Sequence, residues 1–267
     1  SGALAKVNSG VKGTMTAGQV LTQVTKTGDF FQRKLAGLLR KMLVGVNVHV
    51  IEKGDPLPEA LRGDPDWERA RAVYLPPAIN GGKREVYLRG ASFGEHNGVN
   101  NVTILHELLH AALNRRVFAG LQAGRAGMDA PLVKFIDELQ DLMALASVVY
   151  KGLDRRGAVP AALKELVDAT IVVDPRTGKA SYEIFELPHE FLSYGMTESA
   201  MQNFMKQLPS QRGNVFSRFA KAIMDYLKLG PKDASAFTDL LSVTEDIAAA
   251  PMEGLPAAKE AEASYAK

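Results

Sequence analysis

Residues 102–113 form a mainly apolar stretch in which the polar side chains recur at helical spacing. Its polar members, Thr103, His106, Glu107 and His110, fall with Asn114 on one stripe at 3.6 residues per turn. All other positions are apolar: Val102, Ile104, Leu105, Leu108, Leu109, Ala111, Ala112 and Leu113. The pattern predicts a helix that is buried on nearly every side and whose polar stripe needs partners inside the fold.

The spacing His-Glu-x-x-His on this helix indicates a metal site. His106 and His110 lie about one turn apart on the same face, so both imidazoles can bind one ion. Glu107 would lie beside the metal and accept a proton from an activated water. The chain has no cysteine, so any metal must be held by His, Asp or Glu. We therefore expect a zinc site with Glu107 as general base; the alternative is a core helix that carries the motif by chance.

A catalytic zinc needs a third protein ligand. A third histidine in the pattern HExxHxxGxxH is excluded, because positions 113 and 116 are Leu and Arg. The remaining common solution is a Glu on a separate downstream helix. Residues 186–198 contain several acids and open a predicted helix at Pro188, so this segment is the best place for such a ligand.

Two blocks of sequence carry a resemblance to a known family. The first is HELLHAAL, residues 106–113, and the second is P-x-E-F-L-S-x-G-M-T, residues 188–197. Together with the strand and loop before the first block, they resemble the zincin-like metallopeptidase domains of large phage and plasmid polyvalent proteins. The resemblance implies a domain of a giant multidomain protein, which the missing initiator Met and a linker-like tail would suit.

The resemblance also implies the third ligand. In zincins with a Glu ligand, the ligand helix often reads Glu-x-x-Ser, and Glu190 with Ser193 matches this pattern. Glu190 is therefore the expected ligand, with Glu198, Glu186 and His189 as alternatives. The simpler interpretation of Glu190 is a first-turn carboxylate that stabilises the helix dipole.

Substrate-binding residues are implied in the same way. In zincins the strand before the HExxH helix is an edge strand that pairs with an extended peptide, so Val86, Tyr87 and Leu88 are expected to bind substrate. An ordinary sheet strand is the alternative. Tyr194 is the expected catalytic donor to the developing oxyanion, and His189 and Tyr182 are alternatives. The remaining histidines, His49 and His96, are expected to be structural or surface residues, and Trp67 indicates nothing about function.

The elements expected along the chain define an α+β class: a predominantly helical, zincin-like fold with a small N-terminal mixed β-sheet and the HExxH active-site helix. Strands are expected at 46–51, 71–75 and 84–89, and a hairpin at 171–173 and 181–185. Helices are expected at 17–42 with a break near Gly28, then at 101–116 with Asn101 as its N-cap, and at 131–153, 161–169, 188–207, 214–229 and 234–249. We expect a flexible segment 1–15, a domain 16–250 with a sheet subdomain 16–120 and a helical subdomain 121–250, and a linker-like tail 251–267.

Composition narrows the possible functions. The net charge is only +2 and no apolar run approaches the roughly 20 residues that span a bilayer, so nucleic acid and membrane are not indicated as partners. No signal peptide is visible, which favours the cytoplasm of a bacterial host or a virion. The expected function is a zinc metallopeptidase whose polypeptide substrate is its parent polyprotein or a host protein. The alternatives are a zincin-fold binding or structural module with little or no hydrolysis, and hydrolysis of a non-peptide amide.

Overall fold

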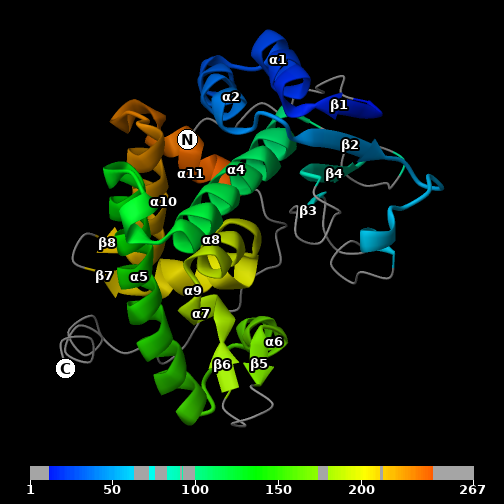
Figure 1. Ribbon diagram of the computed structural model, residues 1–267. Helices are drawn as coiled ribbons and strands as arrows, with labels where there is room; N and C mark the ends of the chain where they lie inside the picture. Colours follow the sequence, from blue (N-terminus) through cyan, green and yellow to red (C-terminus); the bar gives the residue numbers. More distant parts are fainter. Residues whose placement is uncertain are drawn as a thin grey trace. The chain divides into compact units, whose positions relative to one another are not determined.

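The computed structural model describes residues 12–62, 72–75, 83–90, 92, 100–173, 180–210 and 213–242. The chain divides into two compact units, residues 1–116 and 117–267, and each is described by itself. Helices dominate and a small mixed sheet accompanies them (Figure 1), which confirms the α+β class.

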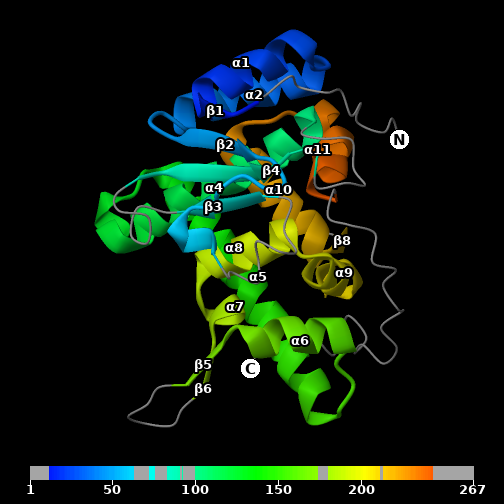
Figure 2. The same cartoon turned by 90° about the vertical axis from the view of Figure 1, so that its right-hand side faces the viewer.

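Two helices open the first unit. They are α1 (Ala17–Thr27) and α2 (Phe30–Met42), and they lie side by side in Figures 1 and 2. Asp29 caps α2, and its side chain accepts a hydrogen bond from the backbone N–H of Gln32 at 2.8 Å. The chain breaks between the helices at Gly28, as the sequence predicted.

The sheet of the first unit has four strands in the order β1-β2-β4-β3. These are β1 (Thr14–Thr16), β2 (Asn47–Ile51), β3 (Ala72–Leu75) and β4 (Glu85–Arg89). The central pair β2–β4 is parallel, and both outer pairs are antiparallel. The sequence predicted the last three strands but not β1, because three residues are too few to show an alternating pattern. Residues 1–11 lie outside the described part of the chain.

Strand β4 lies inside the sheet. Its main chain pairs with β2 on one side and β3 on the other. Val86, Tyr87 and Leu88 are only 1%, 5% and 1% exposed. The prediction that these three residues form a substrate-binding edge is therefore wrong, since both rows of backbone hydrogen-bonding groups are already used.

Helix α4 (Asn101–Ala123) contains the HExxH motif and passes from the first unit into the second. Asn100 caps it, and its side-chain Oδ1 accepts hydrogen bonds from the N–H groups of Val102 and Thr103, both at 3.0 Å. The predicted cap, Asn101, is one residue too late. The predicted end at residue 116 is too early, because the buried Val117 continues the helix beyond the polar residues 114–116.

The second unit is mainly helical. After α4 and a short 3₁₀ turn its elements are α5 (Ala130–Arg155), α6 (Ala161–Ala169), β5 (Ile171–Val173), β6 (Ala180–Tyr182), α7 (Glu183–Glu186), α8 (Pro188–Thr197), α9 (Ser199–Gln207), β7 (Pro209–Ser210), β8 (Gly213–Asn214), α10 (Val215–Leu227) and α11 (Ala234–Leu241). The single helix predicted at 188–207 is broken at Glu198, whose backbone is extended. The second hairpin strand ends at Tyr182 rather than residue 185, because α7 begins there. Helix α11 ends at Leu241 with Ser242 as its C-cap, earlier than the predicted residue 249, and residues 243–249 lie outside the described part of the chain.

Helix α5 is the longest helix of the second unit, and α8 and α10 pack along it (Figure 1). Phe135 of α5 stacks on Tyr226 of α10, with ring centroids 4.8 Å apart. Arg218 of α10 pairs with Glu138 of α5 at 2.8 Å. These contacts fix α10 along the first half of α5.

Candidate metal centre

The polar stripe predicted on α4 is present. The eight apolar residues of its 102–113 segment are all at most 2% exposed. Thr103, Glu107, His110 and Asn114 are half-buried and follow one another at intervals of four, three and four residues, and His106 beside them is 4% exposed. The helix is therefore buried on all sides except this stripe, as the sequence predicted.

The start of α4 is anchored by a buried amide cluster within the first unit. The Nδ2 group of Asn101 lies 3.1 Å from Oγ1 of Thr27 and 3.3 Å from Oε1 of Gln32. Asn101 and Gln32 are both fully buried. Because a buried amide without partners is costly, this cluster fixes the first turn of α4 at the junction of α1 and α2.

A second contact holds α4 beyond the motif. The guanidinium of Arg115 donates to the backbone oxygen of Met42, the last residue of α2, at 3.3 Å. The amide cluster at Gln32 lies near the start of α2, so α2 and α4 run in the same direction. His106 and His110 lie between these two anchors, which limits rotation of the helix about its axis.

The donor set on the stripe fits zinc by its chemistry. Two imidazoles one helical turn apart, with a carboxylate next to the first, are ligand types that zinc binds in proteins without thiolates. Among the described residues, no three His, Asp or Glu side chains are grouped so as to hold a metal ion. The candidate ligands His106 and His110 and the candidate base Glu107 all lie on α4, in the first unit.

Helix α8 carries the expected third ligand. Its half-buried residues include Glu190, Ser193, Tyr194 and Thr197, which are spaced as one helical face. The remaining positions of its middle are buried: Phe191, Leu192, Gly195 and Met196. Glu190 and Tyr194 therefore share a face, one turn apart, as i,i+4 spacing requires.

His189 lies against the end of α4 that belongs to the second unit. Its Nε2 is 3.3 Å from Oε1 of Glu190. Its ring meets Phe118 edge to face, with centroids 5.2 Å apart. The first turn of α8 is thus packed beside residue 118 of α4, two turns beyond the HExxH motif.

The other candidates from the 182–198 segment lie elsewhere. Glu198 does not continue the face of Glu190, because α8 ends at residue 197. The carboxylate of Glu186 accepts a hydrogen bond from Oγ of Ser181 at 2.5 Å. Tyr182 packs against Tyr150 of α5, with centroids 6.2 Å apart. His96 and Trp67 lie outside the described residues.

A second polar cluster lies on the sheet and was not predicted as such. The rings of His49 and Tyr87 stack at 4.7 Å, and Nδ1 of His49 lies 2.9 Å from Oγ1 of Thr14. The hydroxyl of Tyr87 donates to Glu85 at 2.7 Å, and Nε2 of His49 lies 3.3 Å from the same carboxylate without a well-directed hydrogen bond. Burial, and then the hydrogen bond to Glu85, raise the pKa of Tyr87, so its phenol stays a donor.

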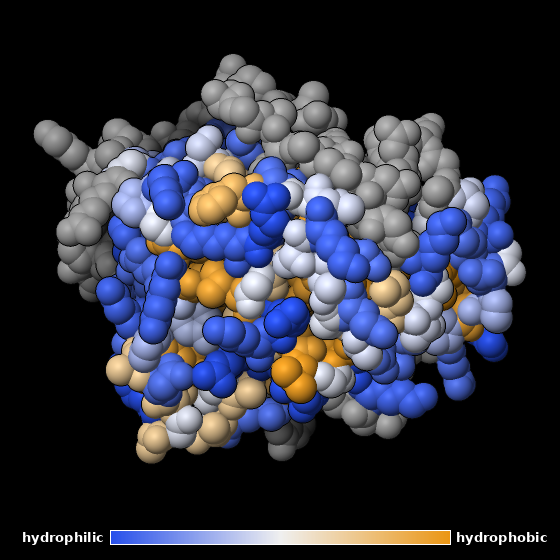
Figure 3. Space-filling model, turned by 90° about the horizontal axis from the view of Figure 1, so that it is seen from above, coloured by the Kyte–Doolittle hydropathy of each residue, from blue (hydrophilic) through white to orange (hydrophobic). Residues whose placement is uncertain are grey.

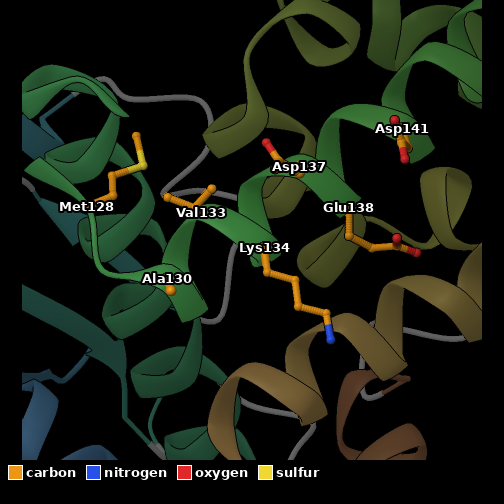
Figure 4. Close-up of a pocket in the computed structure, with 7 residues that line it drawn as sticks. All are labelled: Met128, Ala130, Val133, Lys134, Asp137, Glu138 and Asp141. Carbon is orange, nitrogen blue, oxygen red and sulfur yellow. The ribbon is translucent and has the colours of Figure 1, made fainter. Parts of the chain in front are cut away.

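A hollow of about 520 Å³ lies along the first half of α5 (Figure 4). It is lined by Met128, Ala130, Val133, Lys134, Asp137, Glu138 and Asp141. Two of its acids are already paired: Asp137 with Arg125 at 2.7 Å, and Glu138 with Arg218 at 2.8 Å. The hollow therefore does not offer a free carboxylate set for a metal.

Comparisons of the chain with protein-family models, curated proteins and solved structures find no match. Within the described part of the chain, none of the helices combines the length and apolar character needed to cross a bilayer.

Proposed function

We propose that this protein is a zinc-dependent metallopeptidase with a zincin-like fold. His106 and His110 are the proposed ligands on α4, Glu107 is the proposed base, and Glu190 is the proposed third ligand. The observation that carries the proposal is the burial of α4 on all sides except the stripe that holds the motif. Two imidazoles one helical turn apart, with a carboxylate next to the first, are the side chains and the spacing with which proteins bind zinc.

Each side chain has a distinct role in the proposed reaction. Bound zinc would polarise the peptide carbonyl and lower the pKa of a coordinated water to about 7. Glu107 takes the proton of the attacking water and passes it to the leaving amine. Tyr194, which shares a helix face with Glu190, donates a hydrogen bond to the developing oxyanion.

The choice of Glu190 rests on its own helix. It lies on the half-buried face of α8, and the neighbouring His189 packs on Phe118 of α4. Glu198 and Glu186 are weaker candidates, because the first lies beyond the end of α8 and the second is engaged with Ser181. Carboxylates that bind a metal are usually oriented by a second side chain. His189, whose Nε2 lies 3.3 Å from Oε1 of Glu190, is placed to orient Glu190 in this way.

An extended peptide would have to add to an outer strand of the sheet. Since β4 is internal, β3 is the outer strand next to it. Main-chain pairing there would give affinity with little dependence on the substrate side chains. The parent polyprotein of a phage or mobile element and a host protein are both substrates of this kind.

The second candidate function is a zincin-fold binding or structural module with little or no hydrolysis. The retained Glu107 favours the peptidase, because hydrolysis is the step that needs a base.

Metal content tests the proposed zinc site. Wild-type protein reconstituted with zinc and dialysed should retain one equivalent, and His106→Ala should lose it. The matched control is His49→Ala, which removes a histidine outside the motif and should leave zinc content unchanged. Glu190→Gln should weaken zinc binding, whereas Glu198→Gln should not.

Turnover separates the peptidase from the module. Glu107→Gln should keep its zinc and lose cleavage of a peptide library by roughly 10²–10⁴-fold, the usual contribution of a general base. A Glu107→Gln enzyme as active as wild type would falsify the mechanism. Wild-type protein that binds zinc but cleaves no substrate would support the binding module.

A further inference from the structure

The outer face of α2 has a regular arrangement of residues that the proposed peptidase does not use. Phe30 and Gly37 lie seven residues apart along the middle of this face, and Val44 lies seven residues further on, in the turn after α2; Phe30 is 63% exposed and Val44 is 72% exposed. Two rows of cations, also spaced by seven, flank them: Arg33 with Arg40, and Lys34 with Lys41. We call these seven residues the α2 basic face.

The sequence around α2 contains little negative charge. Asp29 is the only acid in residues 17–44, and its carboxylate caps α2. In the described part of the chain, Arg40 and Lys41 form no ion pair. Residues 1–116 contain 16 Lys and Arg against 10 Asp and Glu, a net charge of +6, whereas residues 117–267 have 16 against 20, a net charge of −4. The small net charge of the whole chain therefore conceals a basic first unit.

Helix stability explains only part of the pattern. Arg40 and Lys41 lie in the last turn of α2, where cations favour the helix dipole. Arg33 lies near the other end of α2, where the dipole disfavours a cation, so the dipole does not account for it. One guanidinium nitrogen of Arg33 donates to the oxygen of Gly28 at 2.8 Å, which uses only part of its donor capacity.

Gly37 is the second feature that the fold does not explain. It lies in the middle of α2, its φ is not positive, and a Cβ at this position would meet no atom within 4 Å. Glycine inside a helix is less stable than alanine, so an exposed glycine without a packing role is unfavourable for the fold alone. Glycine is favoured where a ligand must approach the backbone closely.

We propose that the α2 basic face binds the phosphate backbone of a nucleic acid. Two rows of Arg and Lys along one helix are the electrostatic pattern expected for phosphates, and Gly37 between them lets a phosphate approach the helix. The exposed ring of Phe30 can stack on an unpaired base. This inference is independent of the proposed peptidase activity.

A membrane or an apolar helical partner fits this face less well. Its two exposed apolar residues lie 14 positions apart, one in the first turn of α2 and one in the turn after its end, with cations and a glycine between them. Insertion into lipid or packing against a helix needs a continuous apolar stripe. Figure 3 looks onto the side that carries α1 and α2 at the top of Figure 1, and its surface is mostly hydrophilic with separate hydrophobic patches.

Salt-dependent binding tests the charges. The full chain is titrated against labelled 20-mers, and binding is measured by fluorescence anisotropy from 50 to 300 mM salt. Single-stranded DNA, duplex DNA and single-stranded RNA are tested separately. Each phosphate contact contributes about 0.7 to 0.9 to the slope of log K against log salt. The double variant Arg40→Ala/Lys41→Ala should therefore reduce the slope by about 1.4 to 1.8. The double variant Lys134→Ala/Lys228→Ala, with the same change in net charge in the second unit, should leave it unchanged.

Two glycine variants test the close approach. Gly37→Ala should raise the thermal midpoint yet weaken DNA binding at least fivefold, because a methyl group would occupy the space of the phosphate. Gly152→Ala in α5, where a Cβ also meets no atom within 4 Å, should raise the thermal midpoint and leave binding unchanged. A role of Gly37 in folding alone would change only stability.

Three results would overturn the proposal. The first is no binding to any of the three nucleic acids at 50 mM salt. The second is an equal loss of binding in the control double variant, which would indicate attraction to net charge alone. The third is binding to vesicles of anionic lipid or to polyglutamate that is tighter than binding to DNA and RNA and equally sensitive to Arg40→Ala/Lys41→Ala.

Discussion

At the scale of single residues, Gln202 links three helices through one buried amide. It lies on α9 and is 1% exposed. Its Nε2 donates to the oxygen of Met196 on α8 at 3.0 Å and to the oxygen of Leu241 on α11 at 2.7 Å. Both acceptors are main-chain groups near the end of a helix, where no intrahelical donor satisfies them. The side chain therefore replaces a donor that the helices cannot supply.

Gln202→Ala should remove both hydrogen bonds and leave two carbonyl groups without a partner. Each unsatisfied buried group costs about 1–3 kcal/mol, so we expect a loss of about 2–6 kcal/mol in the free energy of unfolding. Urea unfolding followed by circular dichroism measures it. Asn203→Ala, at a half-buried position of the same helix, is the control and should change stability by less than about 0.5 kcal/mol.

Tyr150 gives the second unit a predictable response to high pH. It is 1% exposed, and burial, followed by the charges of Asp154 and Asp168, raises its pKa. In the unfolded chain the phenol ionises near pH 10, so stability is fully present below that pH and falls as the pH rises above it.

The slope of that loss should approach about 1.4 kcal/mol per pH unit for this tyrosine. Tyr150→Phe, which cannot ionise, should therefore lose less stability than wild type between pH 9 and pH 11. Unfolding free energies at pH 8, 9, 10 and 11 give the comparison. Parallel curves for the two proteins would show that the Tyr150 phenol has an ordinary pKa.

At the scale of elements, the packing of α8 against α10 depends on a residue without a side chain. A Cβ on Gly195 would lie 2.9 Å from Cζ of Phe219 and 3.1 Å from Cε of Met205. Phe219 is fully buried and also meets Phe191 edge to face, at 6.0 Å. The close contact of Gly195 with Phe219 and Met205 thus sets the position of α8, the helix that carries Glu190 and Tyr194.

Gly195→Ala should destabilise the protein despite the higher helix propensity of alanine. Overpacking costs about 1–3 kcal/mol and the gain in propensity is about 1 kcal/mol, so we expect a net loss of up to about 2 kcal/mol. In thermal unfolding, Gly195→Ala should lower the midpoint whereas Gly152→Ala should raise it, although the chemical change is the same. A stabilised Gly195→Ala would mean that α8 and α10 are packed less closely.

The elements also show which features the sequence could predict. The burial of α4 follows from residues 102–113 themselves, since the helical period is a local property. The internal position of β4 does not, because it depends on pairing with residues 72–75 and 47–51. The expectation of an edge strand came from the resemblance to zincins, whereas Glu85 and Tyr87 satisfy each other by a hydrogen bond within the sheet. The partners of Asn101 at Thr27 and Gln32 were likewise unpredictable, because they lie about 70 residues away.

At the scale of the whole molecule, one continuous helix belongs to both units. The boundary falls between Arg116 and Val117, and α4 extends from residue 101 to residue 123. Val117 is fully buried on the second side of this boundary. A break in the helical backbone at residues 112–117 should therefore disturb the part of α4 in each unit.

Arg116→Pro should break that continuity. Proline removes one intrahelical hydrogen bond and clashes with the preceding turn, at a cost of about 3 kcal/mol or more. Arg116→Ala is the matched control, because it removes the same exposed side chain and keeps the helix. Calorimetry should show a lower midpoint for the proline variant alone; equal midpoints for the two variants would contradict a continuous helix.

The parallel pairing at the centre of the sheet has a consequence for the order of folding. Asn47 of β2 faces Glu85 of β4, 38 positions further along the chain, whereas the contacts of α1 with α2 join near neighbours. Closing such a long loop costs entropy before any contact repays it, so distant pairs form slowly. In refolding experiments the α1–α2 pair should gain its protection from hydrogen exchange early. The amides of β2 and β4 should gain theirs in the last step, which sets the rate for the first unit.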